Sequence, residues 1–388
     1  MKTICCVVIF TTLWHVFQFE TDELKLVAAL FRHGDKTPDG LATYPKNPHT
    51  NFSYNPYGQG ELTDQGRRRA YLLGNALRTM YSKYIDGVEL KAVSTDFNRT
   101  KDSLYLVLNG LFDDGDNFDL THPLKHFDFE VAPIKNNRLL SFPMVLCPRY
   151  QEIYKQYEAS EEGIKMLKKY AANIPYIYED TGVNITNFFQ LVPIFDTIKS
   201  NEEWGMEIPT WAKPVYQYLM SAVENVYMST VALPRLNKLF GGVLLNEILR
   251  NIDKDTETKR LFLYSAHDLN VVGLLGAMEL YWPHIPHYTA CIIIELHQIG
   301  HIPYVKVLYQ ADYSNGFKEM KLSQCDVLCP LEQFKKTVDR SIPGDKDNCN
   351  YTQDTIFLDC VERSTRYALT FTRFNHHSVD EHPVSRSV

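Results

Sequence analysis

The sequence predicts an α/β protein whose sheet, flanked by helices, carries its chemistry at one edge. Three apolar runs, at residues 24–31, 88–93 and 261–264, each lead directly into a polar or charged cluster. Strand, then cluster, then helix recurs along the chain. In open α/β sheets, ligands bind beyond the carboxyl ends of the strands. We therefore expect the three clusters to meet in one site.

The first unit combines a strand, a long loop and a helix. Residues 24–31 form an apolar run with one charge, as a buried strand would, and Gly34 and Pro38 mark its end. Arg32 and His33 stand at its carboxyl end. Residues 39–60, rich in Pro, Asn, Tyr and Gly, predict a loop. Thr63 then caps an amphipathic helix whose predicted apolar face consists of Ala70, Leu73, Leu77 and Met80.

The second and third units repeat this arrangement. Residues 88–93 alternate as a strand does and give way to the polar cluster 94–99, which ends in Arg99. Residues 261–264 lead into His267 and Asp268, and residues 269–278 have the composition of a buried helix. The β-rich runs 290–297 and 304–310, separated by a turn with glycine, predict a hairpin that extends the sheet.

The stretch between the second and third units predicts an insertion. Helical patterns at residues 160–170 and 215–228 are separated by prolines. We expect a mostly α-helical insert domain at 141–236, and an α/β catalytic domain formed by 20–140 together with 237–388.

The amino terminus resembles a secretory signal peptide. Lys2 precedes the apolar run 4–10, which predicts a signal over about residues 1–19 with cleavage between His15 and Thr21. The alternative is a buried first strand. No second membrane segment is evident, so we expect a secreted, extracellular and soluble mature chain.

Cysteines and sequons fit secretion. Six cysteines follow the signal, and the closely spaced Cys325 and Cys329 favour a local disulfide, because the further ligands that a zinc site needs are not evident. Sequons that predict glycosylation begin at Asn51, Asn98, Asn184 and Asn350.

The net charge of -7 argues against a nucleic-acid-binding protein held by bulk electrostatics. Any anion site must therefore be local, and the three clusters contain the residues that phosphoryl transfer needs. Arg32 and Arg99 offer planar guanidinium groups to a phosphate, His33 offers a nucleophile, His267 a further donor and Asp268 a proton donor.

Each of these residues also has a structural interpretation. An arginine such as Arg99 is most often a surface ion-pair partner, and Asp268 stands where a helix N-cap is expected. His33 alone fits a hydrogen-bonded strand-end histidine. Asp35 has no separate chemical task in this scheme and is expected to line the turn or the pocket. The functional interpretation depends on all the pieces occurring together.

The ordered set of motifs resembles the histidine acid phosphatases, in particular the secreted insect venom acid phosphatases, which include allergens. The resemblance covers most of the mature chain. It is carried by Arg32-His33-Gly34 with Lys36 and Pro38, residues 62–66, residues 94–96 before Arg99, Ser265-Ala266-His267-Asp268, and the pair Cys325 and Cys329.

The resemblance implies an activity that needs no metal or other cofactor. His33 would form a phosphohistidine, with Arg32, Arg99 and His267 as phosphate ligands and Asp268 as proton donor. It also implies a phosphoglycerate-mutase-like sheet with a helical insert, small phosphomonoester substrates, a homodimer by analogy, and disulfides Cys147–Cys360 and Cys325–Cys329, and it leaves Cys291 and Cys349 open.

Two positions depart from the simple pattern. Lys36 stands where the family commonly has a second arginine, so the charge is kept but the bidentate fork is lost. We still expect Lys36 to bind phosphate. The sequon at Asn98 abuts Arg99, so a glycan there would have to point outward along the rim of the pocket.

Three other functions compete with this hypothesis. A metal-dependent phosphatase would use His33, Asp35, His267 and Asp268 as ligands and would lose activity in chelator. A mutase or a phytase would share the fold. A secreted binding protein without catalysis would keep the pocket only to hold an anion. Intact His33 and Asp268 favour an enzyme that is active at acidic pH.

Overall fold

A computed structural model describes residues 22–39, 43–112, 124–133, 137–140, 142–254 and 257–347, and Cys349. The predicted signal peptide, the sequon at Asn350 and Cys360 lie outside the described residues. No helix in the described part of the chain is long and apolar enough to cross a bilayer.

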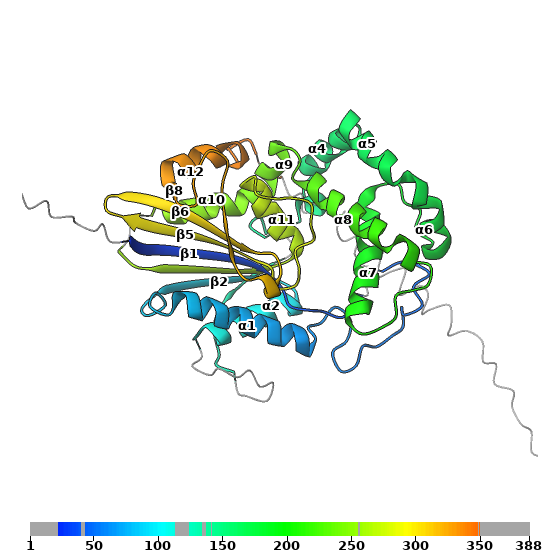
Figure 1. The fold of residues 1–388 in the computed structure, drawn as a ribbon, viewed down its shortest axis with the longest axis horizontal. Coiled ribbons are helices and arrows are strands. Elements are labelled where there is room, and N and C mark those ends of the chain that lie inside the picture. Colours follow the sequence, from blue (N-terminus) through cyan, green and yellow to red (C-terminus); the bar gives the residue numbers. More distant parts are fainter. Residues whose placement is uncertain are drawn as a thin grey trace, which may run out of the picture.

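One mixed sheet runs through the centre of the molecule (Figure 1). Its path is β3-β2-β4-β1-β5-β6-β7, and β8 pairs with β6. Strands β1 to β4 are parallel, and β5, β6 and β7 are antiparallel to their neighbours. The strands are β1 (Asp22–Arg32), β2 (Glu89–Thr95), β3 (Glu130–Ala132), β4 (Arg260–Ala266), β5 (Cys291–Ile299), β6 (Ile302–Gln310), β7 (Lys318–Met320) and β8 (Cys329–Pro330). The α/β class, the three motif-bearing strands and the hairpin are thereby confirmed.

Helices cover both faces of this sheet and one end of it. Figure 1 shows α1 and α2 on one face, α10, α11 and α12 on the other, and α4 to α8 gathered beyond the strand ends. The helices are α1 (Asp64–Tyr81), α2 (Asn98–Phe112), α3 (Pro143–Leu146), α4 (Pro148–Glu158), α5 (Glu161–Tyr170), α6 (Ile174–Thr181), α7 (Leu191–Glu203), α8 (Tyr216–Thr230), α9 (Pro234–Leu239), α10 (Gly241–Ile252), α11 (Asp268–Ala277) and α12 (Leu331–Val338).

Strand β1 supplies side chains to two apolar cores. Val27, Ala29 and Phe31 pack with α1 and α2, whereas the alternate residues Leu26 and Leu30 face the opposite core. That second core continues into α4, α6, α7 and α8. The helices α4 to α8, called the helical segment below, therefore pack against the sheet through a shared apolar core. This core holds them over the strand ends.

Helix α1 begins as the sequence predicts but buries a narrower face. The Thr63 side chain accepts a hydrogen bond from the backbone N–H of Gly66, and Ala70, Leu73 and Leu77 are buried. Met80 is 40% exposed, so the prediction that it belongs to the core face is wrong. The neighbouring Tyr81 is buried instead, and its hydroxyl donates a hydrogen bond to Glu295.

The cysteines pair partly as the family resemblance implies. Cys325 and Cys329 form the predicted disulfide. Cys147, however, is bonded to Cys349, so the expected Cys147–Cys360 pair is wrong. The Cα atoms of Cys147 and Cys349 lie 5.2 Å apart, within the reach of a disulfide, and this bond ties the start of α4 to the chain after α12. Cys291 is a buried free thiol.

Three of the predicted glycosylation sites are accessible. Asn51, Asn98 and Asn184 are all exposed. The amide of Asn98 donates a hydrogen bond to Glu61 at 3.0 Å on the exterior, while the neighbouring Arg99 faces the interior. A glycan attached to Asn98 would extend outward, as expected.

Candidate active site

His33 stands where β1 ends between two neighbouring strands. Its backbone N–H donates to the carbonyl of Ala266 in β4 at 3.0 Å, and Arg32 donates to the carbonyl of Ala290, just before β5, at 2.9 Å. The side chain of His33 is buried, and its ring lies 5.4 Å from that of His267. The parallel pairing of β1 with β4 thus brings the first and third clusters together.

One hydrogen bond determines which nitrogen of His33 is free. Nδ1 lies 2.8 Å from the carbonyl oxygen of Gly34. A carbonyl can only accept, so Nδ1 must carry the proton, and the lone pair of the neutral ring is on Nε2. Burial, together with the charges of Arg99, Arg32 and His267, lowers the pKa of His33 well below its ordinary value. His33 is therefore a neutral imidazole with Nε2 available for attack.

Arg32 is held rigidly beside His33. Its guanidinium donates to the carbonyl of Pro286 at 2.7 Å, lies 3.0 Å from the Asp268 carboxylate and stacks 4.3 Å above the ring of Tyr288. Its Nε–H is buried and has no partner among the residues that the structure describes. A buried donor without an acceptor costs free energy, on the order of 1–3 kcal/mol, which an incoming anion would recover.

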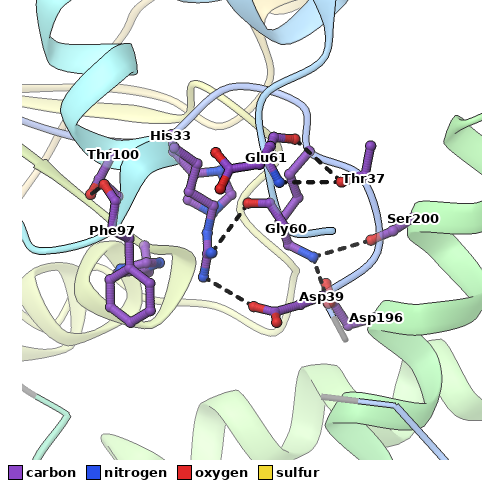
Figure 2. A network of polar contacts seen from close by, with 12 residues as sticks. His33, Thr37, Asp39, Gly60, Glu61, Phe97, Thr100, Asp196 and Ser200 are labelled. Carbon is purple, nitrogen blue, oxygen red and sulfur yellow. Dashed lines mark hydrogen bonds and ion pairs between the residues drawn. The ribbon is translucent and has the colours of Figure 1, made fainter. Parts of the chain in front are cut away.

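Arg99 comes to the site from the start of α2. It pairs with Asp39 at 3.5 Å, donates to the carbonyl of Gly60 at 3.4 Å and lies 4.6 Å from the centre of the Phe97 ring. Figure 2 shows Asp39 and Gly60 on the loop that faces it. Its Nε is likewise buried, without a hydrogen-bond partner in the described part of the chain. Two guanidinium groups near His33 thus each keep an unused donor.

Lys36 is buried and contacts the helical segment. Its ammonium lies 2.9 Å from Asp196 and 3.4 Å from the Ser200 hydroxyl, both on α7 (Figure 2). Burial raises the pKa of Asp196, but the charges of Lys36, Arg32 and Arg99 outweigh burial and lower it overall. The helical segment therefore contributes directly to this site.

His267 uses both ring nitrogens within the protein. Nε2 lies 3.1 Å from the Thr95 hydroxyl, which itself donates to Thr100, so Nε2 carries the proton. Nδ1 accepts from the backbone N–H of Asn270 in a capping box at the start of α11. Burial and the charges of Arg99, Arg32 and Lys36 lower the pKa of His267. To donate to a phosphate, the Nε2–H must either give up its hydrogen bond to the Thr95 hydroxyl or share its proton between Thr95 and the phosphate.

Asp268 and Asp35 have distinct partners. Asp268 accepts from the Tyr227 hydroxyl of α8 and pairs with Arg32. Asp35 is turned away, pairing with Arg69 of α1 at 2.9 Å. No group of three His, Cys, Asp or Glu side chains within the described ranges is arranged to hold a metal ion.

A family model described as the histidine phosphatase superfamily (branch 2) matches residues 23–310. The chain belongs to this family. Venom acid phosphatase Acph-1 of Apis mellifera is 30% identical over 84% of this chain and 87% of its own length. Prostatic acid phosphatase of Rattus norvegicus is 31% identical over 84% of this chain and 88% of its own. These relatives identify this histidine phosphatase as a phosphomonoesterase of the acid phosphatase type.

Solved structures support the fold. The phytase of Citrobacter braakii matches with a TM-score of 0.60 at 14% identity, over 82% of this chain and 98% of that one. The phytase of Hafnia alvei in complex with myo-inositol hexakis sulphate matches with a TM-score of 0.59 at 14% identity, over 83% and 97%. At this identity the likeness concerns the fold alone.

The structure brings all six predicted site residues of this histidine phosphatase into one buried region. It also adds residues that sequence reasoning missed, namely Asp39, Asp196, Ser200, Tyr227 and Tyr288. Asp196, Ser200 and Tyr227 come from helices whose sequence carries no motif. From the sequence one could expect only that the insert helps to form the pocket walls. This expectation does not identify single residues.

Proposed function

We propose that this acid phosphatase hydrolyses phosphate monoesters through a covalent phosphohistidine on His33. The observation that carries this proposal is a neutral, correctly tautomeric His33 next to two arginines, Arg32 and Arg99, whose buried Nε–H donors lack acceptors. A phosphoryl group placed between them would receive both donors, and its phosphorus would face Nε2.

The first step forms one bond and breaks another. The lone pair of His33 Nε2 attacks phosphorus while the bond from phosphorus to the ester oxygen breaks. Asp268, entering the step as the carboxylic acid, gives its proton to the departing oxygen, and the alcohol leaves. Arg32, Arg99, Lys36 and His267 supply hydrogen bonds to the phosphoryl oxygens.

The second step restores the enzyme. Water attacks the phosphohistidine, the bond between nitrogen and phosphorus breaks, and the Asp268 carboxylate takes a proton from that water. Orthophosphate leaves with Asp268 protonated again. Because Asp268 must carry a proton when the alcohol leaves, acidic solution favours the first step.

Rapid quenching tests the covalent route. A phosphomonoester labelled in its phosphoryl group should leave acid-labile, base-stable label on the protein, and His33→Ala should abolish both the label and turnover. His126→Ala, which changes an exposed histidine, is the matched control and should retain both. Steady turnover without any labelled protein would rule out the phosphohistidine, and loss of activity in chelator would favour the metal-dependent alternative.

We also propose that the protein is secreted after removal of residues 1–19. The exposed sequons at Asn51, Asn98 and Asn184 and the two disulfides support this proposal. Expression in a eukaryotic cell should place the protein in the medium with a new amino terminus between His15 and Thr21. Retention in the cell with Met1 intact would contradict it.

A further inference from the structure

A cavity of about 330 Å³ opens on the Asp268 side of the site. Arg32 and Asp268 line it, together with side chains of α7, α8 and residues 282–288. In the proposed function, on which this inference rests, Asp268 protonates the departing oxygen. The alcohol part of the substrate must therefore occupy this cavity, and the cavity walls determine which alcohols fit.

Much of the wall is apolar or aromatic. Trp282 is the largest such side chain, is 43% exposed, and stacks on His284 with 4.3 Å between ring centres. The other apolar side chains that line the cavity are Val192, Phe195, Met220, Val223, Ile285 and Ala311. An exposed indole face at a cavity can bind a cation through its π electrons.

The charged side chains of the wall are mostly acidic. The carboxylates that line it are Asp196, Glu203, Glu224, Asp268 and Asp312, and the only permanent cations are Arg32 and Lys199. Arg32 is paired with Asp268, and Lys199 with Glu203 at 3.3 Å. Glu224 has no ion-pair or hydrogen-bond partner among the residues that the structure describes. Burial raises the pKa of Glu224, and once this carboxyl is ionised its negative charge is not compensated by any cation among the described residues.

Glu224 is close to the chemistry. It lies three residues before Tyr227 on α8, which is about 4.5 Å along a helix, and Tyr227 donates its hydroxyl to Asp268. The charge of Glu224 also contributes to raising the pKa of Tyr281, the residue next to Trp282 in the sequence. The free carboxylate and the exposed indole therefore belong to the same part of the wall.

We propose that this cavity selects phosphomonoesters of amino alcohols, with the cationic nitrogen bound between Glu224 and Trp282. A short chain would connect this nitrogen to the phosphoryl group at His33. The same charges disfavour polyanionic substrates, because every further phosphate would face the carboxylates of the cavity wall. A phytase, in contrast, needs a broadly basic cavity. The fold shared with phytases therefore does not extend to their substrate class.

Two substrates of equal shape test this inference. Phosphocholine and 3,3-dimethylbutyl phosphate differ only in a quaternary nitrogen against a carbon atom. We expect kcat/KM to be about tenfold higher for phosphocholine, equivalent to roughly 1.4 kcal/mol, at the highest pH at which turnover is measurable and Glu224 is ionised. A simple aryl phosphate serves as the reference for phosphatase activity, and phytate should be a poorer substrate than either isostere.

Variants assign the effect to residues. Glu224→Gln should reduce the ratio between the two isosteres to near one, whereas Glu152→Gln, an exposed acid on α4 outside the cavity, should keep it. Equal kcat/KM for the two isosteres in the wild type, or an unchanged ratio in Glu224→Gln, would overturn the inference and leave the phosphatase intact. Absence of turnover for all substrates, the aryl phosphate included, would instead contradict the proposed function.

Discussion

At the scale of residues, each strong cation of the site has a carboxylate of the same chain as its partner. Arg32 pairs with Asp268, Lys36 with Asp196 and Arg99 with Asp39. The pocket before substrate binds is therefore close to neutral, and a phosphate dianion must compete for donors or use the two free Nε–H groups. In the proposed mechanism, these two donors direct the phosphoryl group to a position next to His33.

Replacement of Lys36 tests whether it binds phosphate. Lys36→Ala should lower kcat/KM for an aryl phosphate by about 10- to 100-fold, the equivalent of one charge-assisted hydrogen bond of roughly 1.5–3 kcal/mol. This change also leaves the Asp196 carboxylate without its ion-pair partner, which could destabilise the fold. The double variant Lys36→Ala/Asp196→Asn removes that charge as well and therefore controls for misfolding. Unchanged KM and turnover in Lys36→Ala would show that Lys36 only anchors α7.

The pH dependence of kcat/KM tests the state of His33. Its pKa is lowered, so Nε2 keeps its lone pair as the solution becomes acidic, and activity should persist well below pH 6.5. On the basic side, activity should fall, because the departing oxygen needs a proton from the leaving-group acid. The profile is corrected for the titration of the substrate itself. An acidic limb with an apparent pKa near 6.5 would mean that His33 is not the nucleophile in this environment.

At the scale of elements, the start of α1 packs directly against the loop that follows His33. A Cβ atom added to Gly34 would lie 2.3 Å from the carbonyl oxygen of Gly66, and one added to Gly66 would lie 2.2 Å from that of Asp35. The two glycines therefore allow the backbone of the loop to lie directly on the first turn of α1. This close approach explains why residues 62–66 accompany Arg32-His33-Gly34 in the motif set.

Gly66→Ala should disturb both stability and activity. The new methyl group would meet backbone rather than a flexible side chain, so we expect a loss of about 1–3 kcal/mol in the free energy of unfolding and a marked fall in kcat. Urea unfolding and aryl phosphate turnover measure the two effects. Gly344→Ala is the matched control, because its Cβ would lie an ordinary 3.7 Å from the nearest atom. Equal behaviour of the two variants would contradict this role for Gly66.

At the scale of the whole molecule, a network of polar side chains lies at the end of the sheet opposite to the site. His297 of β5 is bonded to Asp22 at 2.9 Å through Nδ1 and to Glu295 at 2.9 Å through Nε2. Glu295 is itself buried and accepts from the Tyr81 hydroxyl at 2.5 Å. This network joins β1, β5 and α1 at the start of the chain's described part.

His297 should make the fold more stable in acid. Burial alone would lower its pKa, but the hydrogen bonds to Glu295 and Asp22 and their charges raise it overall. A raised pKa in the folded state means that this stabilisation is complete below the unfolded value of about 6.5 and is lost as pH rises through the folded value. The difference in melting temperature between wild type and His297→Gln should therefore be largest in acid and shrink toward alkaline pH. A difference that is constant with pH would contradict it.

The local structure and the residues at the strand ends follow from the amino-acid sequence alone. Strand and helix periodicities are local, so β1, β2, β4 and the hairpin could be predicted from short windows. The rule that ligands bind at carboxyl strand ends then placed His33, Arg99, His267 and Asp268 near each other. The close spacing of Cys325 and Cys329 favoured their local disulfide, and the family resemblance implied the same pair.

The distant side chains that complete the site could not be predicted, because long-range packing brings them there. Lys36 meets Asp196 across 160 residues of sequence, Tyr227 reaches Asp268 from a helix without a motif, and Cys147 finds Cys349 across 202 residues. The proton on Nδ1 of His33 likewise depends on how the Gly34 carbonyl is turned. Periodicity shows which face of a helix is buried but not against what, because such contacts depend on how the helical segment packs over the strand ends.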